Sequence, residues 1–301
     1  MTTLPPPPNL TDIKALTFDV FGTVVDWRTS ITSTLRSAFA SKLHHPPSLS
    51  PEAQAYLTSL TQPQSQPLAD FAQAWRTSYG EFTRSFVPGT TPWKDIDTHH
   101  RDSLVSLLAS PRYHGLQDQD QNEIVLFSPE EIENLSRAWH FLVPWPDSSE
   151  GIHRLNRKFV TATLSNGNLS LLEDLNSQRT QQRDDDGGRA QDQDEVRVQG
   201  LGFQKLISAE DFRAYKPNPA VYLGACEKLG LRPDEVAMVA AHLGDLAAAR
   251  ALGMRTVYVG RREEEEWKEG EARFREARGW VDLWVAEGEG GFVEVARRLG
   301  V

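Results

Sequence analysis

The sequence predicts an α/β protein with a parallel sheet, because strand-like and helix-like segments alternate along the chain. Short apolar runs typical of buried strands lie at residues 13–18, 159–164, 236–240 and 256–259. Helix-like stretches at residues 220–229 and 246–252 lie among the later runs. Strands that alternate with helices favour a parallel sheet that carries helices on its faces.

The first apolar run, IKALTF, marks the start of the fold. It ends at Asp19 and is followed by Gly22, a pattern that fits a buried strand entering a tight loop. Further along, Gly253 directly follows the helix-like stretch 246–252 and fits a C-terminal stop. These residues mark the ends of the predicted core elements.

Residues 27–142 interrupt the alternation of strands and helices. Long amphipathic patterns such as residues 68–86 take its place, together with a Pro-, Ser- and Gln-rich stretch near residues 46–67. We interpret this segment as an inserted, mostly helical domain. The core then consists of residues 11–26 and 143–301.

Two polar segments of the core have a different composition from the rest. Residues 176–199 are almost free of large apolar side chains, which predicts a disordered polar insert because such a segment cannot bury enough surface to order itself. Residues 261–278 are rich in Glu and Arg. The simplest interpretation of this run is a solvated helical face without a binding role.

Length and composition indicate a globular protein with a sizeable core. The chain has 301 residues, of which 39% are hydrophobic and 25% charged. Its net charge of −10 disfavours a nucleic-acid partner. The single cysteine, Cys226, cannot form an internal disulfide, which fits a reducing cytosol. Without a signal-like start or a long apolar run, we expect a cytoplasmic protein with no membrane segment.

Polar clusters are predicted at one edge of the sheet. They lie at residues 19–23, 165–168, 215–217 and 242–245. In an open α/β sheet, ligands bind beyond the carboxyl ends of the strands. We therefore expect a carboxylate, a hydroxyl, an amide, an ammonium group and a second carboxylate to meet in one crevice.

The chemistry that suits such a crevice is nucleophilic catalysis by a carboxylate, with Asp19 as the nucleophile. A free carboxylate is a weak nucleophile, so it must be oriented and kept ionised. The Lys216 cation favours the charged form. Backbone donors in the Asp19 loop, with the Ser165 and Thr23 hydroxyls, are candidates for holding an anionic substrate group or the developing charge.

An ester formed on such a nucleophile must afterwards be released by water. That step requires a second base that orients and activates the water molecule. The sequence offers Asp245 and His242 for this role, since both follow the strand-like run at residues 236–240.

Four short motifs in order carry a resemblance to a known family. They are DVFGT at residues 19–23, SNG at 165–167, YKP at 215–217, and a strand-like run that is followed by Asp245. In this order they resemble the haloacid dehalogenase superfamily. The resemblance implies a Rossmann-like core with Asp19 as nucleophile and an inserted helical cap domain.

The residue at position 21 narrows the resemblance. Phosphatases of the superfamily usually have a second aspartate there as general acid for the leaving alcohol, whereas this chain has Phe21. An aromatic residue followed by Gly-Thr resembles the type II (S)-2-haloacid dehalogenases, in which halide leaves without protonation and no metal is needed. The resemblance therefore implies that Phe21 faces the substrate and that no cofactor is required.

The same resemblance implies roles for further side chains. Arg76, in the pair Trp75-Arg76, would lie over the leaving halide. The other implied site residues match family positions: Ser165 and Asn166 for substrate and halide, Lys216 as the cationic partner of the nucleophile, Tyr222 as a tyrosine of the site, and Asp245 for positioning the hydrolytic water.

This chain departs from the best-known haloacid dehalogenases ahead of the last aspartate. Ala240 and His242 stand where those enzymes have a serine and an asparagine, and Gly244 replaces a bulky aromatic residue. These changes affect the halide pocket and the water site. His242 is then a candidate base that activates water, which would suit a variant dehalogenase, including an enzyme that acts on a small fluorinated acid. Alternatively, His242 indicates a different hydrolytic substrate.

The sequence thus predicts a hydrolase that removes halide from short 2-halo carboxylic acids through an aspartyl ester, giving 2-hydroxy acids. The expected partner is this small carboxylic acid, with a homodimer left open. One alternative is a metal-dependent phosphatase in which the Phe21 carbonyl ligates Mg²⁺. The other is a non-catalytic binding module that kept the fold.

Overall fold

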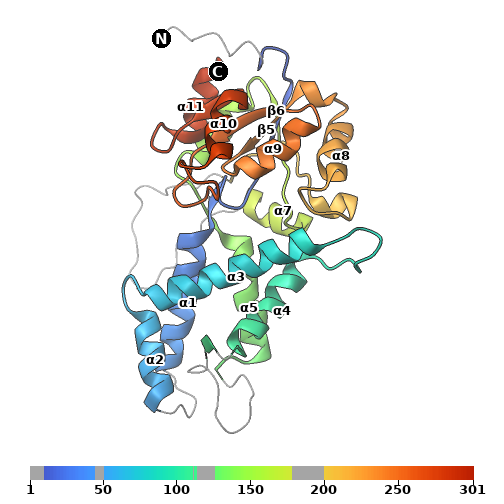
Figure 1. Cartoon of the computed structure of the whole chain (residues 1–301). Coiled ribbons are helices and arrows are strands. Elements are labelled where there is room, and N and C mark those ends of the chain that lie inside the picture. The colour runs from blue at the N-terminus through green and yellow to red at the C-terminus, as the bar shows by residue number, and fades with distance from the viewer. Residues whose placement is uncertain (1–9, 45–50, 111, 114–125, 178–199) are drawn as a thin grey trace, which may run out of the picture.

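The computed structural model describes residues 10–44, 51–110, 112–113, 126–177 and 200–301. It confirms the predicted Rossmann-like parallel sheet with an inserted helical cap domain (Figure 1). Most of the predicted polar insert, residues 178–199, lies outside the described residues. None of the helices in the described ranges combines the length and apolar character that a membrane span needs.

The central sheet has five parallel strands in the order β4-β1-β5-β6-β7. They are β1 (Ala15–Phe18), β4 (Val160–Thr163), β5 (Val236–Ala240), β6 (Arg255–Val259) and β7 (Leu283–Val285). Every residue of β1 and β5 is buried, which explains why these strands appear in the sequence as nearly continuous apolar runs. Because all five strands run the same way, their carboxyl ends meet at one edge.

Helices cover both faces of the sheet. They are α6 (Ser148–Leu155), α7 (Leu169–Ser177), α8 (Pro219–Leu229), α9 (Leu243–Ala251), α10 (Ala272–Trp280) and α11 (Gly291–Arg298), with short 3₁₀ turns η4 (Ala209–Phe212) and η5 (Pro233–Glu235). Helix α6 packs against α11, and α8 packs against α9. Helix α9 begins three residues before the predicted start at 246, because the His242 carbonyl already accepts the Asp245 and Leu246 N–H groups.

The cap is a helical unit on one side of the sheet (Figure 1). It contains α1 (Trp27–His44), α2 (Pro51–Thr61), α3 (Gln66–Ser85), α4 (Ile96–Leu108), α5 (Pro129–Ser136) and η3 (Arg137–Phe141). The chain enters and leaves it through two short antiparallel strands, β2 (Val25–Asp26) and β3 (Val143–Pro144). The predicted domain limits at residues 27 and 142 lie next to these two strands and stay a prediction.

An aromatic cluster fixes the position of α3 in the cap. The ring of Trp75 packs edge-on against Trp139, which stacks on Trp27 at the start of the cap. The Trp75 indole N–H also reaches the His100 carbonyl and the Ser103 hydroxyl, at 3.0 and 3.1 Å. Trp75 is therefore locked in place, and the next residue of α3 is held toward the core.

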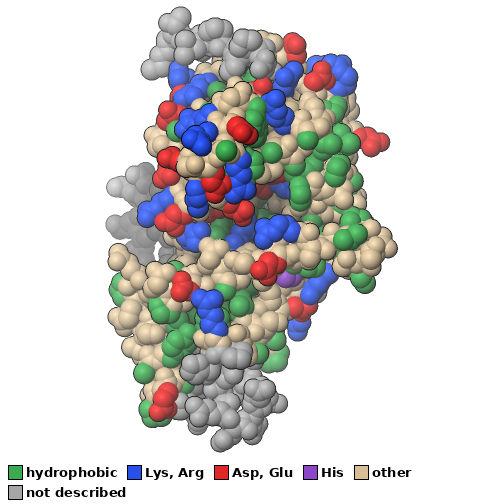
Figure 2. All heavy atoms as spheres, in the orientation of Figure 1, with side chains coloured by type: hydrophobic (Ala, Val, Ile, Leu, Met, Phe, Trp, Pro, Cys, Tyr) green, Lys and Arg blue, Asp and Glu red, His purple; other side chains and the backbone are tan. Residues whose placement is uncertain are grey.

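The interpretation of residues 261–278 as a solvated helical face is wrong in its first half. Only the part from Ala272 onward is helical, and Arg261 and Glu264 are buried. Arg261 forms a bidentate ion pair with Asp147, with Nη1–Oδ1 and Nη2–Oδ2 distances of 2.6 and 2.8 Å. A charge can be buried when such a partner satisfies it, which composition alone does not reveal. Figure 2 shows basic and acidic side chains intermingled where the core meets the cap.

Candidate active site

Asp19 is the first residue beyond β1. Its backbone N–H continues the sheet by donating to the Val239 carbonyl at 3.0 Å, so the side chain leaves the sheet at the carboxyl edge. The residue is only 7% exposed. Oδ2 accepts a 2.7 Å hydrogen bond from the Thr23 hydroxyl, and Oδ1 accepts a 2.8 Å hydrogen bond from Lys216 Nζ. The carboxylate is therefore held in one orientation.

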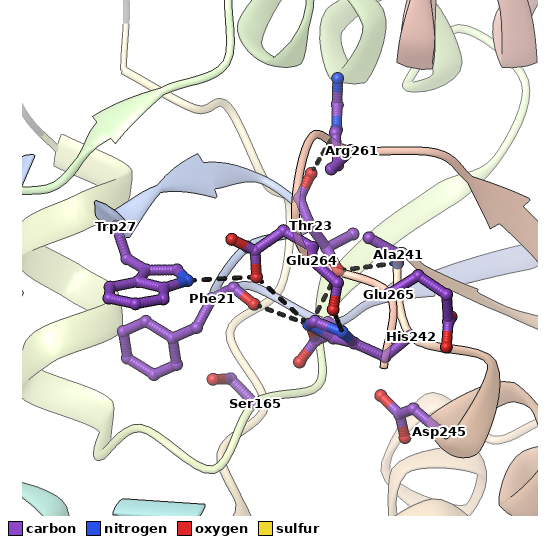
Figure 3. A network of polar contacts seen from close by, with 12 residues as sticks. Phe21, Thr23, Trp27, Ser165, Ala241, His242, Asp245, Arg261, Glu264 and Glu265 are labelled. Atoms are coloured by element: carbon purple, nitrogen blue, oxygen red, sulfur yellow. Dashed lines mark hydrogen bonds and ion pairs between the residues drawn. The ribbon is translucent and has the colours of Figure 1, made fainter. Parts of the chain in front are cut away.

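Thr23 lies behind Asp19 and is fully buried. Its hydroxyl donates to Asp19 and accepts the Ala241 N–H at 2.9 Å, as Figure 3 shows for the second contact. Both contacts are internal to the protein. The Thr23 hydroxyl therefore orients Asp19, and its contact with an anionic substrate group stays a prediction.

Lys216 bridges two carboxylates. In addition to Asp19, its Nζ donates to Asp245 Oδ2 at 2.6 Å, and the residue is 8% exposed. Burial alone would lower the pKa of Lys216, but the two carboxylates raise it above its ordinary value. Burial would likewise raise the pKa of Asp19, but Lys216 and then His242 lower it below its ordinary value. Asp19 is ionised at neutral pH.

Asp245 is placed behind Lys216 by the first turn of α9. One carboxylate oxygen accepts from Lys216, and the other accepts from the Tyr222 hydroxyl of α8. Burial first, and then the neighbouring Asp245 charge, raise the pKa of Tyr222 well above its ordinary value. Asp245 and Tyr222 therefore form a support for the Lys216 ammonium group.

The loop after β4 supplies the next two predicted residues. The Ser165 hydroxyl is fully buried and accepts the Gly167 N–H at 3.2 Å. The Asn166 side-chain oxygen accepts the Lys216 N–H at 2.7 Å, and its nitrogen lies 3.5 Å from the Lys216 carbonyl. Asn166 thus holds the main chain at Lys216 and couples the two loops of the site.

The cap contributes Arg76 of α3. Its guanidinium carbon lies 4.5, 5.6 and 5.7 Å from the ring centres of Tyr79, Phe21 and Trp27. Among the described residues it forms no ion pair with a carboxylate. A cation that is held by rings and lacks a carboxylate partner is suited to bind an anion.

Tyr79 is a site residue that the sequence interpretation missed. It follows Arg76 by three positions on α3, so the two side chains share a helix face. Tyr79 packs edge-on against Phe21 and is buried. Burial raises the pKa of the Tyr79 phenol, the nearby Asp19 charge adds to this, and Arg76 opposes it. The helical spacing from Arg76 was the signal available in the sequence.

His242 lies between β5 and α9 and points toward Phe21 and Glu264 (Figure 3). Its Nδ1 lies 3.1 Å from the Glu264 carbonyl, and its Nε2 lies 3.2 Å from the Phe21 carbonyl and 3.6 Å from Asp19 Oδ2. An imidazole ring donates from both nitrogens only when it is protonated. Burial alone would lower the pKa of His242, but Asp19 and then Glu264 raise it.

Glu264 is the second residue that the sequence interpretation missed. Its carboxylate accepts a 3.1 Å hydrogen bond from the Trp27 indole N–H and lies 4.0 Å from His242 Nε2 (Figure 3). Gly22 makes room for it, because a Cβ there would lie 2.1 Å from Glu264 Oε2. The backbone at Gly22 also has a φ of +82°, which favours glycine.

The site therefore combines a buried ionised carboxylate, two flanking cations and a cation in the cap. In the part of the chain that the structure covers, no group of three or more His, Cys, Asp and Glu side chains is arranged to hold a metal ion. Carboxylate attack on an electrophilic carbon, with loss of an anion toward the cap, is chemistry that this arrangement can perform.

Comparisons with known proteins agree on one group. The family model described as haloacid dehalogenase-like hydrolase matches residues 13–253. A curated relative, (S)-2-haloacid dehalogenase 4A of Burkholderia cepacia, is 31% identical over 130 residues, which cover 43% of this chain and 48% of the relative. A second relative, (S)-2-haloacid dehalogenase 1 of Pseudomonas sp. strain CBS-3, is 34% identical over 127 residues, which cover 41% of this chain and 47% of the relative.

Solved structures extend the similarity over the whole chain. A crystal structure of a defluorinating L-2-haloacid dehalogenase superposes with a TM-score of 0.71 and 26% identity, and the match covers 100% of both chains. In sequence, by contrast, the chain spans about half the length of the curated relatives that it matches.

Proposed function

Because this chain belongs to the haloacid dehalogenase-like hydrolases, we propose that it removes halide hydrolytically from short 2-halo carboxylic acids. The names of its similar relatives support this substrate class. The observation that carries the proposal is the buried, ionised Asp19, which is paired with Lys216. Arg76 of the cap lies over the ring of Phe21, two residues from Asp19, and has no carboxylate partner among the described residues.

In the first step, Asp19 attacks the carbon atom that bears the halogen. A bond forms between a carboxylate oxygen and this carbon, and the carbon–halogen bond breaks with its electron pair leaving on the halide. Arg76 stabilises the halide, since its guanidinium faces three aromatic rings and has no carboxylate partner among the described residues. No proton is transferred, which agrees with Phe21 in place of an acid.

In the second step, water attacks the carboxyl carbon of the Asp19 ester. We assign the water proton to His242, because its Nε2 is 3.6 Å from Asp19 Oδ2, whereas both oxygens of Asp245 are engaged by Lys216 and Tyr222. Esterification removes the Asp19 charge that raises the His242 pKa, so the ring first releases its proton to solvent, and the neutral ring then accepts the proton of the attacking water. His242 then returns a proton to the departing 2-hydroxy acid.

The binding partner in this proposal is the small carboxylic acid alone, without a cofactor. Phosphate-ester hydrolysis is disfavoured, because Phe21 supplies no proton for a leaving alcohol. A non-catalytic binding module is disfavoured by the buried charges of Asp19 and Lys216, which cost free energy to bury. The cytoplasmic location stays a prediction, and the homodimer stays open.

Halide release tests the proposal directly. An ion-selective electrode would follow chloro-, bromo- and fluoroacetate and both enantiomers of 2-chloropropionate, with and without a chelator. We expect halide release that the chelator leaves unchanged and that Asp19→Ala abolishes. Chelator-sensitive phosphate release without halide would favour the phosphatase, and ligand binding that Asp19→Asn preserves, without turnover in the wild type, would favour the binding module.

A further inference from the structure

Oxygen atoms from three residues surround one nitrogen of His242. The Phe21 carbonyl, Asp19 Oδ2 and Glu264 Oε2 lie 3.2, 3.6 and 4.0 Å from Nε2. Carboxylate and carbonyl oxygens are the ligands that Mg²⁺ and Mn²⁺ prefer. In this chain, however, the imidazole ring occupies the space between these oxygens. The residues present therefore do not fit a divalent metal ion.

We propose that the ring of His242 is a built-in cation that stands in the place of a divalent metal ion, and that Glu264 positions it there. A metal ion bound to Phe21 and Asp19 would need ligand distances of about 2.0–2.1 Å. The ring leaves no room for it. The proton on Nε2 faces the same oxygens and offsets the repulsion between the two buried carboxylates.

Glu264 faces both nitrogens of the His242 ring. Its backbone carbonyl accepts from Nδ1, and its carboxylate faces Nε2 while the Trp27 indole N–H holds it in place (Figure 3). Its neighbours in the acidic run lack these contacts: the Glu263 side chain is 56% exposed, and the Glu265 carboxylate accepts backbone N–H groups at the start of α9 and at Trp267. Position 264 is therefore singled out within the run.

The proposal does not depend on the identity of the substrate. It concerns only what occupies the space between Asp19 and Glu264, so metal binding tests it even if no haloacid is turned over. Removing the ring would leave two carboxylates and a carbonyl facing an open space, which is a ligand set for Mn²⁺.

The test measures binding of Mn²⁺ by electron paramagnetic resonance to the full chain. We expect no Mn²⁺ bound at this place in the wild type. In His242→Ala we expect bound Mn²⁺ at concentrations at least about tenfold below any at which the wild type shows binding. A second change, Glu264→Gln, should return the affinity of His242→Ala to the wild-type level. The matched control, Glu263→Gln in the His242→Ala background, should keep the gained affinity because that side chain is exposed.

Two outcomes would overturn the proposal. One is Mn²⁺ binding by the wild type that Asp19→Asn abolishes, since the ring would then not exclude the metal. The other is a folded His242→Ala protein, verified by circular dichroism, that gains no Mn²⁺ affinity. His242→Asn serves as a second variant should His242→Ala fail to fold, because it also vacates most of the ring volume, and the same gain is expected.

Discussion

Lys216 donates a 2.8 Å hydrogen bond from Nζ to Oδ1 of Asp19, although 197 positions separate them in the sequence. Both side chains are about nine-tenths buried. The same ammonium group donates to Asp245, so one cation serves two buried carboxylates. Removing the ammonium group leaves both carboxylates without this shared cation in a low-dielectric site.

Replacing Lys216 with Met should therefore cost both stability and activity. We expect the free energy of unfolding to fall by about 3–5 kcal/mol, because two carboxylates remain buried without their cation. Halide release at neutral pH should fall at least about a hundredfold, because the Asp19 pKa rises. The control is Lys228→Met, since the Lys228 side chain is 45% exposed and should contribute less than about 1 kcal/mol. Equal urea midpoints for the two variants would contradict the expectation.

Tyr222→Phe tests the contribution of the Tyr222–Asp245 hydrogen bond to the placement of Lys216. The change removes the hydroxyl that donates to Asp245 and leaves a buried carboxylate oxygen without this donor. We expect a loss of about 1–3 kcal/mol in unfolding free energy and about a tenfold loss in kcat. Tyr113→Phe is the matched control, because the Tyr113 hydroxyl is buried without a hydrogen-bond partner among the described residues. Similar losses in both variants would remove the special role of Tyr222.

Arg76→Lys tests the recognition of the leaving halide. Lysine keeps the charge but loses the planar group that lies over three aromatic rings. We expect kcat to fall by about ten- to a hundredfold, with unfolding free energy changed by less than about 1 kcal/mol. Arg84→Lys, exposed near the end of the same helix, should leave kcat unchanged. A kcat equal to that of the wild type in Arg76→Lys would place the halide elsewhere.

His140 of the cap forms an ion pair with the core that we expect to depend on pH. Its Nδ1 lies 2.7 Å from Asp174 of α7, and its Nε2 lies 3.0 Å from Asp97 of α4. Burial alone would lower the pKa of His140, but Asp97 and then Asp174 raise it. Since the folded-state pKa exceeds the unfolded value of about 6.5, the stabilisation is complete below that pH and is lost as pH rises through the folded-state pKa.

The His140→Gln variant measures this contribution. We expect it to lower unfolding free energy by about 2 kcal/mol at pH 6 and by clearly less at pH 9, measured by urea unfolding. The control His153→Gln, whose ring contacts the Ser149 carbonyl, should keep the pH dependence of the wild type. An equal loss at both pH values in His140→Gln would show that its charge does not contribute.

Much of the fold could be predicted from the sequence, because buried parallel strands leave continuous apolar runs. The four predicted strands coincide within a residue or two with β1, β4, β5 and β6. Strand β7 has only three residues at the sheet edge, too short a run to be distinctive. The order of strands likewise explains why Asp19, Ser165 and His242 lie at one edge.

What the sequence could not predict depends on partners far away in the chain. Glu264 looks like its acidic neighbours, and only the contact with Trp27, 237 positions earlier, distinguishes it. Arg261 is buried because Asp147, 114 positions earlier, neutralises it. Tyr79 belongs to the site because the aromatic packing of α3 turns that helix face toward Phe21.

The most direct test of the proposed chemistry is a single turnover of a 2-halo acid in ¹⁸O-labelled water, followed by mass spectrometry of the peptide that contains Asp19. With enzyme in excess, we expect one ¹⁸O atom in the Asp19 carboxylate and unlabelled oxygen in the product hydroxyl. Label in the product hydroxyl with none in Asp19 would mean that water attacks the substrate directly, and it would contradict the ester mechanism.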